Sequence, residues 1–166
     1  MKYIIKLATV GCVIAFISCK PEVHREYMME PCPEDEKISA TAQIQQLKED
    51  GFEIFEMVDE TTGDTLIMQQ YFMAFLKKGS NRDQSKTEAD SLQVLHLNHL
   101  TRMYTEGYAD VSGPFGDEGD AMGITIYNVP TLKMADSLAN LDPMVQAGRL
   151  TIEIRPWWAS KGFGLR

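Results

Sequence analysis

From Leu66 onward, the sequence alternates between segments with the two-residue periodicity of strands and segments with the periodicity of helices. In chain order these segments predict strand, helix, strand, strand, helix, strand. This is the order of a split βαβ unit, in which both helices cover one face of an antiparallel sheet. The strands are expected over residues 66–76, 108–111, 122–129 and 150–154, and the helices over 88–106 and from 131 onward.

Capping and glycine signals bound the two expected helices. Thr87 and Asp90 predict the start of the long helix, and Gly107 predicts its end. Pro130 and Thr131 would open the second helix. Together these features predict an α+β, ferredoxin-like fold. The apolar face of the long helix would be Leu92, Leu95, Leu97, Leu100, Met103 and Tyr104, and the buried stripe of the second helix Leu132, Ala135, Leu138 and Ala139.

Turns and an N-terminal extension complete the predicted fold. We expect Ser112-Gly113-Pro114 to turn the chain and Pro156 to stop the last strand, because proline lacks a backbone N–H. Residues 39–65 would add a helix capped by Ser39 and a strand over 52–58, which could pair with 66–76 as a hairpin.

A sheet covered by helices on one face leaves its other face open. Apolar side chains on such a face favour burial against a second surface. The pattern therefore predicts a homodimer.

The first residues have the properties of an export signal. A basic start is followed by an apolar run of about 11 residues over 7–17, which is too short to span a bilayer. The run ends at Phe16-Ile17-Ser18-Cys19, which resembles the lipobox of bacterial lipoproteins, with Phe16 where leucine is commonest. We expect a signal peptide over 1–18, lipid on Cys19, and a place in the bacterial cell envelope, periplasmic or surface-exposed. A cleaved signal with an incidental cysteine and an uncleaved anchor are the alternatives.

The number of cysteines limits the disulfide bonds and metal sites that could stabilise the exported domain. Cys12 would leave with the signal and Cys19 would carry the lipid, so only Cys32 would remain free. One thiol cannot form an internal disulfide, and the sequence has no CxxC pair of the kind that binds structural zinc. The fold would depend on its apolar core, for which 44% hydrophobic residues suffice. Residues 19–38 are expected to form a linker.

The formal net charge of −8 argues against a nucleic-acid partner, because such binding depends on Lys and Arg contacts to phosphates. The acidity is most simply a contribution to solubility. Any membrane affinity would come from the lipid.

A set of short stretches, in a fixed order, carries a further signal. They are Tyr71–Gly79, His96–Leu100, Glu106-Gly107, Gly113–Phe115, Gly119-Asp120, Gly123-Ile124, Asp142-Pro143, Ala147–Leu150 and Glu153–Trp158. Together they resemble the YCII-related family, so residues 66–160 are identified as a YCII-like domain, followed by a tail over 161–166.

The resemblance implies a ferredoxin-like fold that dimerises as an α/β barrel, with a proposed active-site pocket built on a histidine and an aspartate. The family's histidine lies on the long helix, at a fixed spacing before a Gly-Pro turn. In this sequence that spacing selects His96 rather than His99. Its aspartate precedes a proline after the second helix, which selects Asp142. One branch of the family has a lyase-like dehydrochlorinase role, and many members have no known substrate.

The residues themselves leave three interpretations of the histidines open. His96 and His99 are three apart and would share one side of a helix. Histidine titrates near neutral pH, so His96 with Asp142 as partner could perform acid–base catalysis. Both histidines could instead bind a metal, although such pairs are more often four apart and need a further ligand, Asp142 or Asp90. A purely structural role is the third interpretation, above all for His99.

Several other side chains are weaker candidates. The Ser112 hydroxyl could reach the pocket or serve only the turn. Gly113 and Pro114 would set the backbone geometry of the binding site. Arg155 could bind an anionic substrate bidentately, or form an ion pair at the sheet edge. Packing or interface roles, with ligand stacking as the alternative, are expected for Trp157 and Trp158.

We therefore predict a small-molecule enzyme in which His96 and Asp142 transfer protons in lyase- or isomerase-like chemistry, with no cofactor or metal. The alternative is a non-catalytic ligand-binding or homo-oligomeric interaction module on the same fold. The expected partners are a second copy of the chain, an unknown small molecule and, through Cys19, a lipid bilayer.

Overall fold

A computed structural model of the chain describes residues 39–165. The signal peptide, lipid site and linker predicted for residues 1–38 lie outside this range. None of the helices between residues 39 and 165 is both long and apolar enough to span a bilayer. In chain order the elements are α1 (Ala40–Glu49), β1 (Ile54–Val58), β2 (Thr65–Lys78), α2 (Lys86–Thr105), β3 (Ala109–Pro114), β4 (Ala121–Tyr127), α3 (Leu132–Ala139), α4 (Pro143–Gln146) and β5 (Leu150–Ser160).

The long strand β2 organises the sheet. Along one edge it pairs with β5 from Met68 to Lys78, and along the other with β1 over 65–69 and β4 over 72–77. β3 pairs with the free edge of β4. All these pairs are antiparallel, and the order β5-β2-β4-β3 is that of a split βαβ unit. The α+β, ferredoxin-like prediction is confirmed, as is the hairpin that β1 adds to it.

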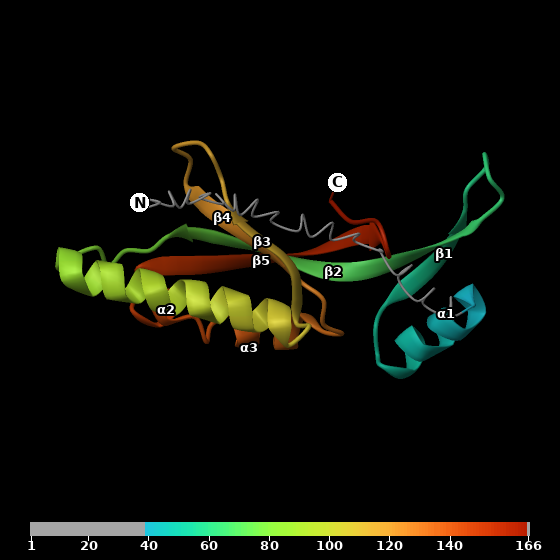
Figure 1. The fold of residues 1–166 in the computed structure, drawn as a ribbon, viewed down its shortest axis with the longest axis horizontal. Coiled ribbons are helices and arrows are strands. Elements are labelled where there is room, and N and C mark those ends of the chain that lie inside the picture. The colour runs from blue at the N-terminus through green and yellow to red at the C-terminus, as the bar shows by residue number, and fades with distance from the viewer. Residues whose placement is uncertain (1–38, 166) are drawn as a thin grey trace, which may run out of the picture. The chain divides into compact units, whose positions relative to one another are not determined.

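Both α2 and α3 lie on the same side of the sheet (Figure 1). Side chains from β2 and β4 alternate between the two faces, and Phe72, Ala74 and Tyr127 face the helices. Burying a large side chain of this kind stabilises the fold by about 1.5–3 kcal/mol. The buried cluster consists of Phe72, Ala74, Met103, Ala109, Tyr127, Val129, Ala135 and Ala139.

The long helix α2 differs from its prediction at its start and on its buried face. Its N-cap is Ser85 rather than Thr87, and the Ser85 hydroxyl accepts from the Glu88 N–H at 3.3 Å. Its buried residues are His96, His99 and Met103. The leucines and tyrosine predicted to be buried include three that are about half exposed or more: Leu95, Leu97 and Tyr104.

The turn predicted at Ser112-Gly113-Pro114 and the strand end predicted at Pro156 are both wrong, because both segments belong to strands. Ser112, Gly113 and Pro114 end β3 and pair with β4. β5 continues through Pro156 to Ser160, and its register with β2 shows no shift there. Among the strands that the structure describes, β5 pairs with β2 alone, and an edge strand accommodates proline when the proline nitrogen faces away from the partner strand.

The second helix begins as predicted and is buried less than predicted. Thr131 caps it, with its hydroxyl accepting from the Met134 N–H at 3.2 Å. Ala135 and Ala139 are buried, whereas Leu132 is 48% exposed.

Candidate active site

A cavity of about 500 Å³ lies between α2 and the sheet, on the face that the helices cover. Its lining comes from α2, from the ends of β2, β3 and β4 that lie near it, from α4 and from the start of β5. Much of the wall is apolar, so a ligand body without charge would be well accommodated. The apolar side chains are Leu76, Leu97, Leu100, Met122, Met144 and Leu150.

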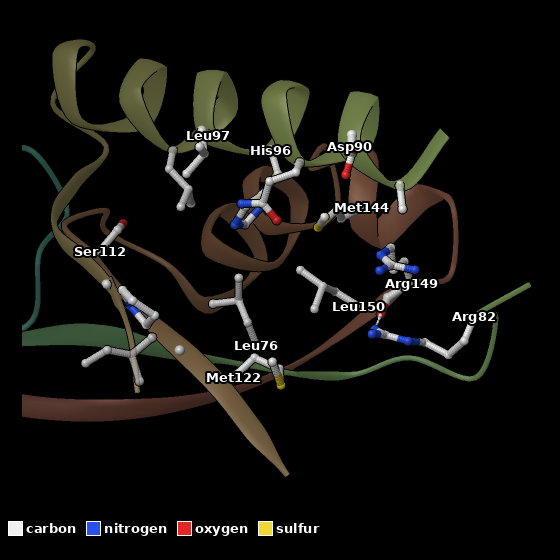
Figure 2. A pocket seen from close by; sticks show the side chains of 17 residues that line it. Leu76, Arg82, Asp90, His96, Leu97, Ser112, Met122, Met144, Arg149 and Leu150 are labelled. Atoms are coloured by element: carbon white, nitrogen blue, oxygen red, sulfur yellow. Dashed lines mark hydrogen bonds between the residues drawn. The ribbon is translucent and has the colours of Figure 1, made fainter. Parts of the chain in front are cut away.

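His96 reaches from α2 into this cavity (Figure 2). Its Nδ1 lies 2.5 Å from Oδ2 of Asp142, which is 46 residues away in the sequence. His96 is 8% exposed and Asp142 2%. The structure therefore brings together the two residues selected as a candidate pair, at the edge of a space that a ligand could enter.

Asp142 is fixed by a second, independent interaction. It is the N-cap of α4, and its Oδ1 accepts a hydrogen bond from the Met144 N–H at 2.9 Å. Pro143 takes the first helical position, where a missing N–H has no cost. One carboxylate oxygen thus starts a helix and the other holds the imidazole of His96.

This geometry sets the tautomer of the imidazole. A carboxylate only accepts hydrogen bonds, so Nδ1 of His96 carries the proton that it shares with Asp142. The other ring nitrogen, Nε2, has no hydrogen-bond partner among residues 39–165, and it is not a buried, sealed-off atom. In the neutral ring, Nε2 is therefore an accessible proton acceptor in the wall of the cavity.

His99 has different surroundings, although it is one helical turn away. It is 5% exposed and does not line the cavity. Its Nδ1 lies 3.4 Å from the Arg102 guanidinium, and its Nε2 is buried without a partner among the described residues. Burial lowers the pKa of His99, an effect that Arg102 and His96 strengthen and Asp142 opposes. These contacts favour a structural role for His99.

The histidine pair does not assemble a metal site with its neighbours. Within residues 39–165, no group of three or more His, Cys, Asp or Glu side chains is placed to hold a metal ion. His96 is instead committed to Asp142 through Nδ1.

Comparisons with known proteins give likenesses among solved structures. No family model matches the chain, and no curated protein matches it. Among solved structures it is similar to 5-chloro-2-hydroxyhydroquinone dehydrochlorinase (TftG) from Burkholderia phenoliruptrix AC1100, solved in complex with 2,5-dihydroxybenzoquinone. The two are 21% identical with a TM-score of 0.41, and the match covers 52% of this chain and 92% of that one.

The β3–β4 hairpin supplies the wall facing α2. Ser112, Gly113 and Pro114 all line the cavity. The Ser112 hydroxyl lies 3.0 Å from the hydroxyl of Thr125, its cross-strand partner, and it has no hydrogen bond to His96 or Asp142. Ser112 is thus available to a ligand and is not part of the histidine–aspartate pair.

Arg155 lies away from the cavity, contrary to its prediction as a substrate-binding residue. It donates to Oε1 of Glu153 through Nε at 2.7 Å, and its guanidinium lies 5.6 Å from the centre of the Phe75 ring. By register, Arg155 and Phe75 face away from α2 and α3, on the open side of the sheet. Its alternative role, an ion pair at the sheet edge, is the one the structure shows.

The two tryptophans also lie outside the cavity lining. The Trp157 ring packs 6.2 Å from that of Tyr71, and the Trp158 ring 5.0 Å from that of Phe55. These contacts join β5 to β2 and to β1, so both tryptophans have packing roles.

Sequence reasoning missed two cationic residues of the cavity, Arg82 and Arg149. Arg149 belongs to a stretch that carries the family resemblance, but nothing in its spacing pointed to the pocket. Arg82 lies in the segment that follows β2 and Gly79, which carried no functional prediction. The signal that could have found both is the pairing of β2 with β5, which places the end of one strand beside the start of the other.

Proposed function

We propose that this protein is a small-molecule enzyme in which His96 is the general base and acid, and Asp142 orients it. One observation carries the proposal. The imidazole is hydrogen-bonded through Nδ1 to a buried carboxylate, and its Nε2 is left open to a cavity of ligand size. This is the arrangement that proton abstraction from a bound molecule requires.

The chemistry that fits is lyase- or isomerase-like. Nε2 takes a proton from an acidic C–H or O–H of the substrate, and the electron pair of that bond forms a new double bond. In an elimination, the leaving group departs with its own electron pair. In an isomerisation, the imidazolium returns the proton to another atom of the same molecule. Asp142 stabilises the imidazolium in both cases, because its carboxylate accepts from Nδ1–H.

The test uses proton exchange, which does not require the natural substrate. A panel of small C–H acids is incubated in deuterated water with the full chain, and deuterium incorporation is followed by NMR. We expect exchange with wild type and a loss of about 10²–10⁴-fold in His96→Gln. His99→Gln, on the same helix and outside the cavity, is the matched control and should retain exchange.

Equal exchange in wild type and His96→Gln would refute the proposal. A panel member that binds in the cavity and is never exchanged would favour the alternative, a non-catalytic ligand-binding module.

We further propose that the domain is YCII-like and forms a homodimer through the open face of its sheet. Support comes from the apolar side chains that register and alternation place there, Met73, Phe75, Ile124 and Ile126, which are only partly buried in one chain. Light scattering should give twice the mass of one chain, and Ile126→Lys should reduce it to one chain. A monomeric wild type would refute this assignment.

We also propose a place in the bacterial cell envelope, held by lipid on Cys19. The support is the basic start, the short apolar run and the lipobox-like Phe16–Cys19.

A further inference from the structure

Two arginines lie together at one end of the cavity. Figure 2 shows the Arg82 and Arg149 side chains grouped there, with His96 farther along the wall. Neither guanidinium forms an ion pair within residues 39–165. The acidic residue of the lining, Asp90, is paired with Lys86 at 2.6 Å. The charge at this end of the cavity is thus positive and not neutralised.

Hydrogen bonds to a backbone carbonyl and to a side-chain amide position the two guanidinium groups. Arg82 Nη1 donates to the Arg149 carbonyl oxygen at 3.1 Å, and Arg149 Nη1 donates to Oε1 of Gln84 at 3.0 Å. Each guanidinium uses one nitrogen in these bonds and has further N–H groups for a ligand. Both side chains are therefore oriented before any ligand arrives, which lowers the entropic cost of binding one.

A close backbone approach makes the arrangement possible. The Gly79 N–H donates to the Arg149 carbonyl oxygen at 3.0 Å, and a Cβ on Gly79 would lie 2.1 Å from the Gly148 carbonyl oxygen. Only glycine allows the segment that follows β2 to lie this close to the turn before β5. Arg82 and Arg149 come from these two segments.

We propose that the cavity binds small carboxylic acids, with the carboxylate on Arg82 and Arg149, an apolar body against the leucine and methionine wall, and the reacting atom at His96. The planar guanidinium matches a carboxylate, which accepts two parallel hydrogen bonds. The apolar wall and the net charge of −8 disfavour a multiply charged ligand. This inference rests on the proposed function for the role of His96, and its binding step can be tested separately.

The probe is benzoate, with benzamide as its neutral analogue and phenyl phosphate as its dianionic one. Binding to the full chain is measured by NMR titration at low ionic strength. We expect benzoate to bind more tightly than both analogues. Arg82→Gln and Arg149→Gln should each weaken benzoate binding by about tenfold or more, since each removes charge-assisted hydrogen bonds.

Three controls make the outcome decisive. Arg155→Gln removes an arginine on the open face of the sheet and should leave benzoate affinity unchanged. Arg82 is exposed, so its variant is expected to fold, and its urea midpoint checks this. His99→Gln, outside the cavity lining, should retain benzoate affinity within about twofold. Benzoate titration and deuterium exchange are separate measurements, so failure of anion binding and failure of proton transfer are distinguishable.

No benzoate binding by wild type, equal binding by the arginine variants, or tighter binding of phenyl phosphate would each overturn the proposal.

Discussion

Replacing Asp142 by asparagine should leave the fold in place and reverse the tautomer of His96. Asparagine is as good an N-cap as aspartate, so its oxygen can still accept from the Met144 N–H. Its amide NH₂ group then faces Nδ1 of His96 and can only donate. Nδ1 becomes the acceptor, the ring proton moves to Nε2, and Nε2 can no longer take a proton from a ligand in the cavity.

The expected magnitudes follow from these contacts. Asp142→Asn keeps the cap and turns one charge-assisted bond into a neutral one, which costs about 1 kcal/mol of unfolding free energy. Proton-transfer activity should fall by about 10²–10⁴-fold. Asp142→Ala loses the cap, at about 1 kcal/mol, and leaves a buried imidazole nitrogen unpaired, at about 1–3 kcal/mol. Its total should be about 2–4 kcal/mol.

Urea unfolding compares the stabilities, and ¹⁵N NMR of the histidine ring distinguishes a protonated Nε2 from an unprotonated one. The deuterium exchange assay gives the activity. If Asp142→Ala unfolds at the same urea concentration as wild type, or if Asp142→Asn keeps the wild-type tautomer, the inferred role of the carboxylate is refuted.

Three further perturbations test other parts of the structure. Because burial lowers the pKa of His99, the unfolded chain binds a proton more readily than the folded chain. The contribution of neutral His99 to the unfolding free energy should therefore be fully present above the ordinary histidine pKa of 6.5 and should decline as the pH falls below it. His99→Gln should flatten that decline in urea midpoints, and an unchanged slope would contradict the assignment. Gly79→Ala should cost about 3 kcal/mol or more, because its Cβ would meet backbone at 2.1 Å; Gly116→Ala, with open space around it, should stay within about 0.5 kcal/mol, and similar urea midpoints for the two would argue against the close approach. Cys19→Ser should move the protein from the membrane fraction to the soluble fraction, and mass spectrometry of wild type that finds no lipid on Cys19 would refute the anchor.

The strand and helix order could be predicted from sequence because each element carries its own periodicity. The prediction was wrong where the hydrophobic pattern was used to infer which face of a helix is buried. On α2 the leucines suggested the buried face, yet the buried residues are His96, His99 and Met103. This stripe has helical spacing as well, and it was overlooked because two of its members are polar. Part of the space between α2 and the sheet is a cavity lined by His96 rather than a packed apolar core. Hydrophobicity alone therefore could not identify the buried face of α2.

The candidate site depended on contacts that no local pattern contains. Asp142 was selected by family resemblance, since the contact with His96 spans 46 residues. Arg82 and Arg149 were missed because their proximity depends on strand register and on Gly79. Pro156 does not end its strand as predicted, because proline is tolerated in an edge strand and the local sequence does not show that β5 is one.

The position of Pro156 has a consequence for how copies of this chain behave when they are concentrated. An unpaired strand edge offers a row of donors and acceptors that can recruit an identical edge from another molecule. β5 presents 11 residues of such an edge, and a proline whose nitrogen points outward leaves a gap in the donor row. A further strand added in register would lack a hydrogen bond at that gap, which disfavours growth into aggregates along this side of the sheet.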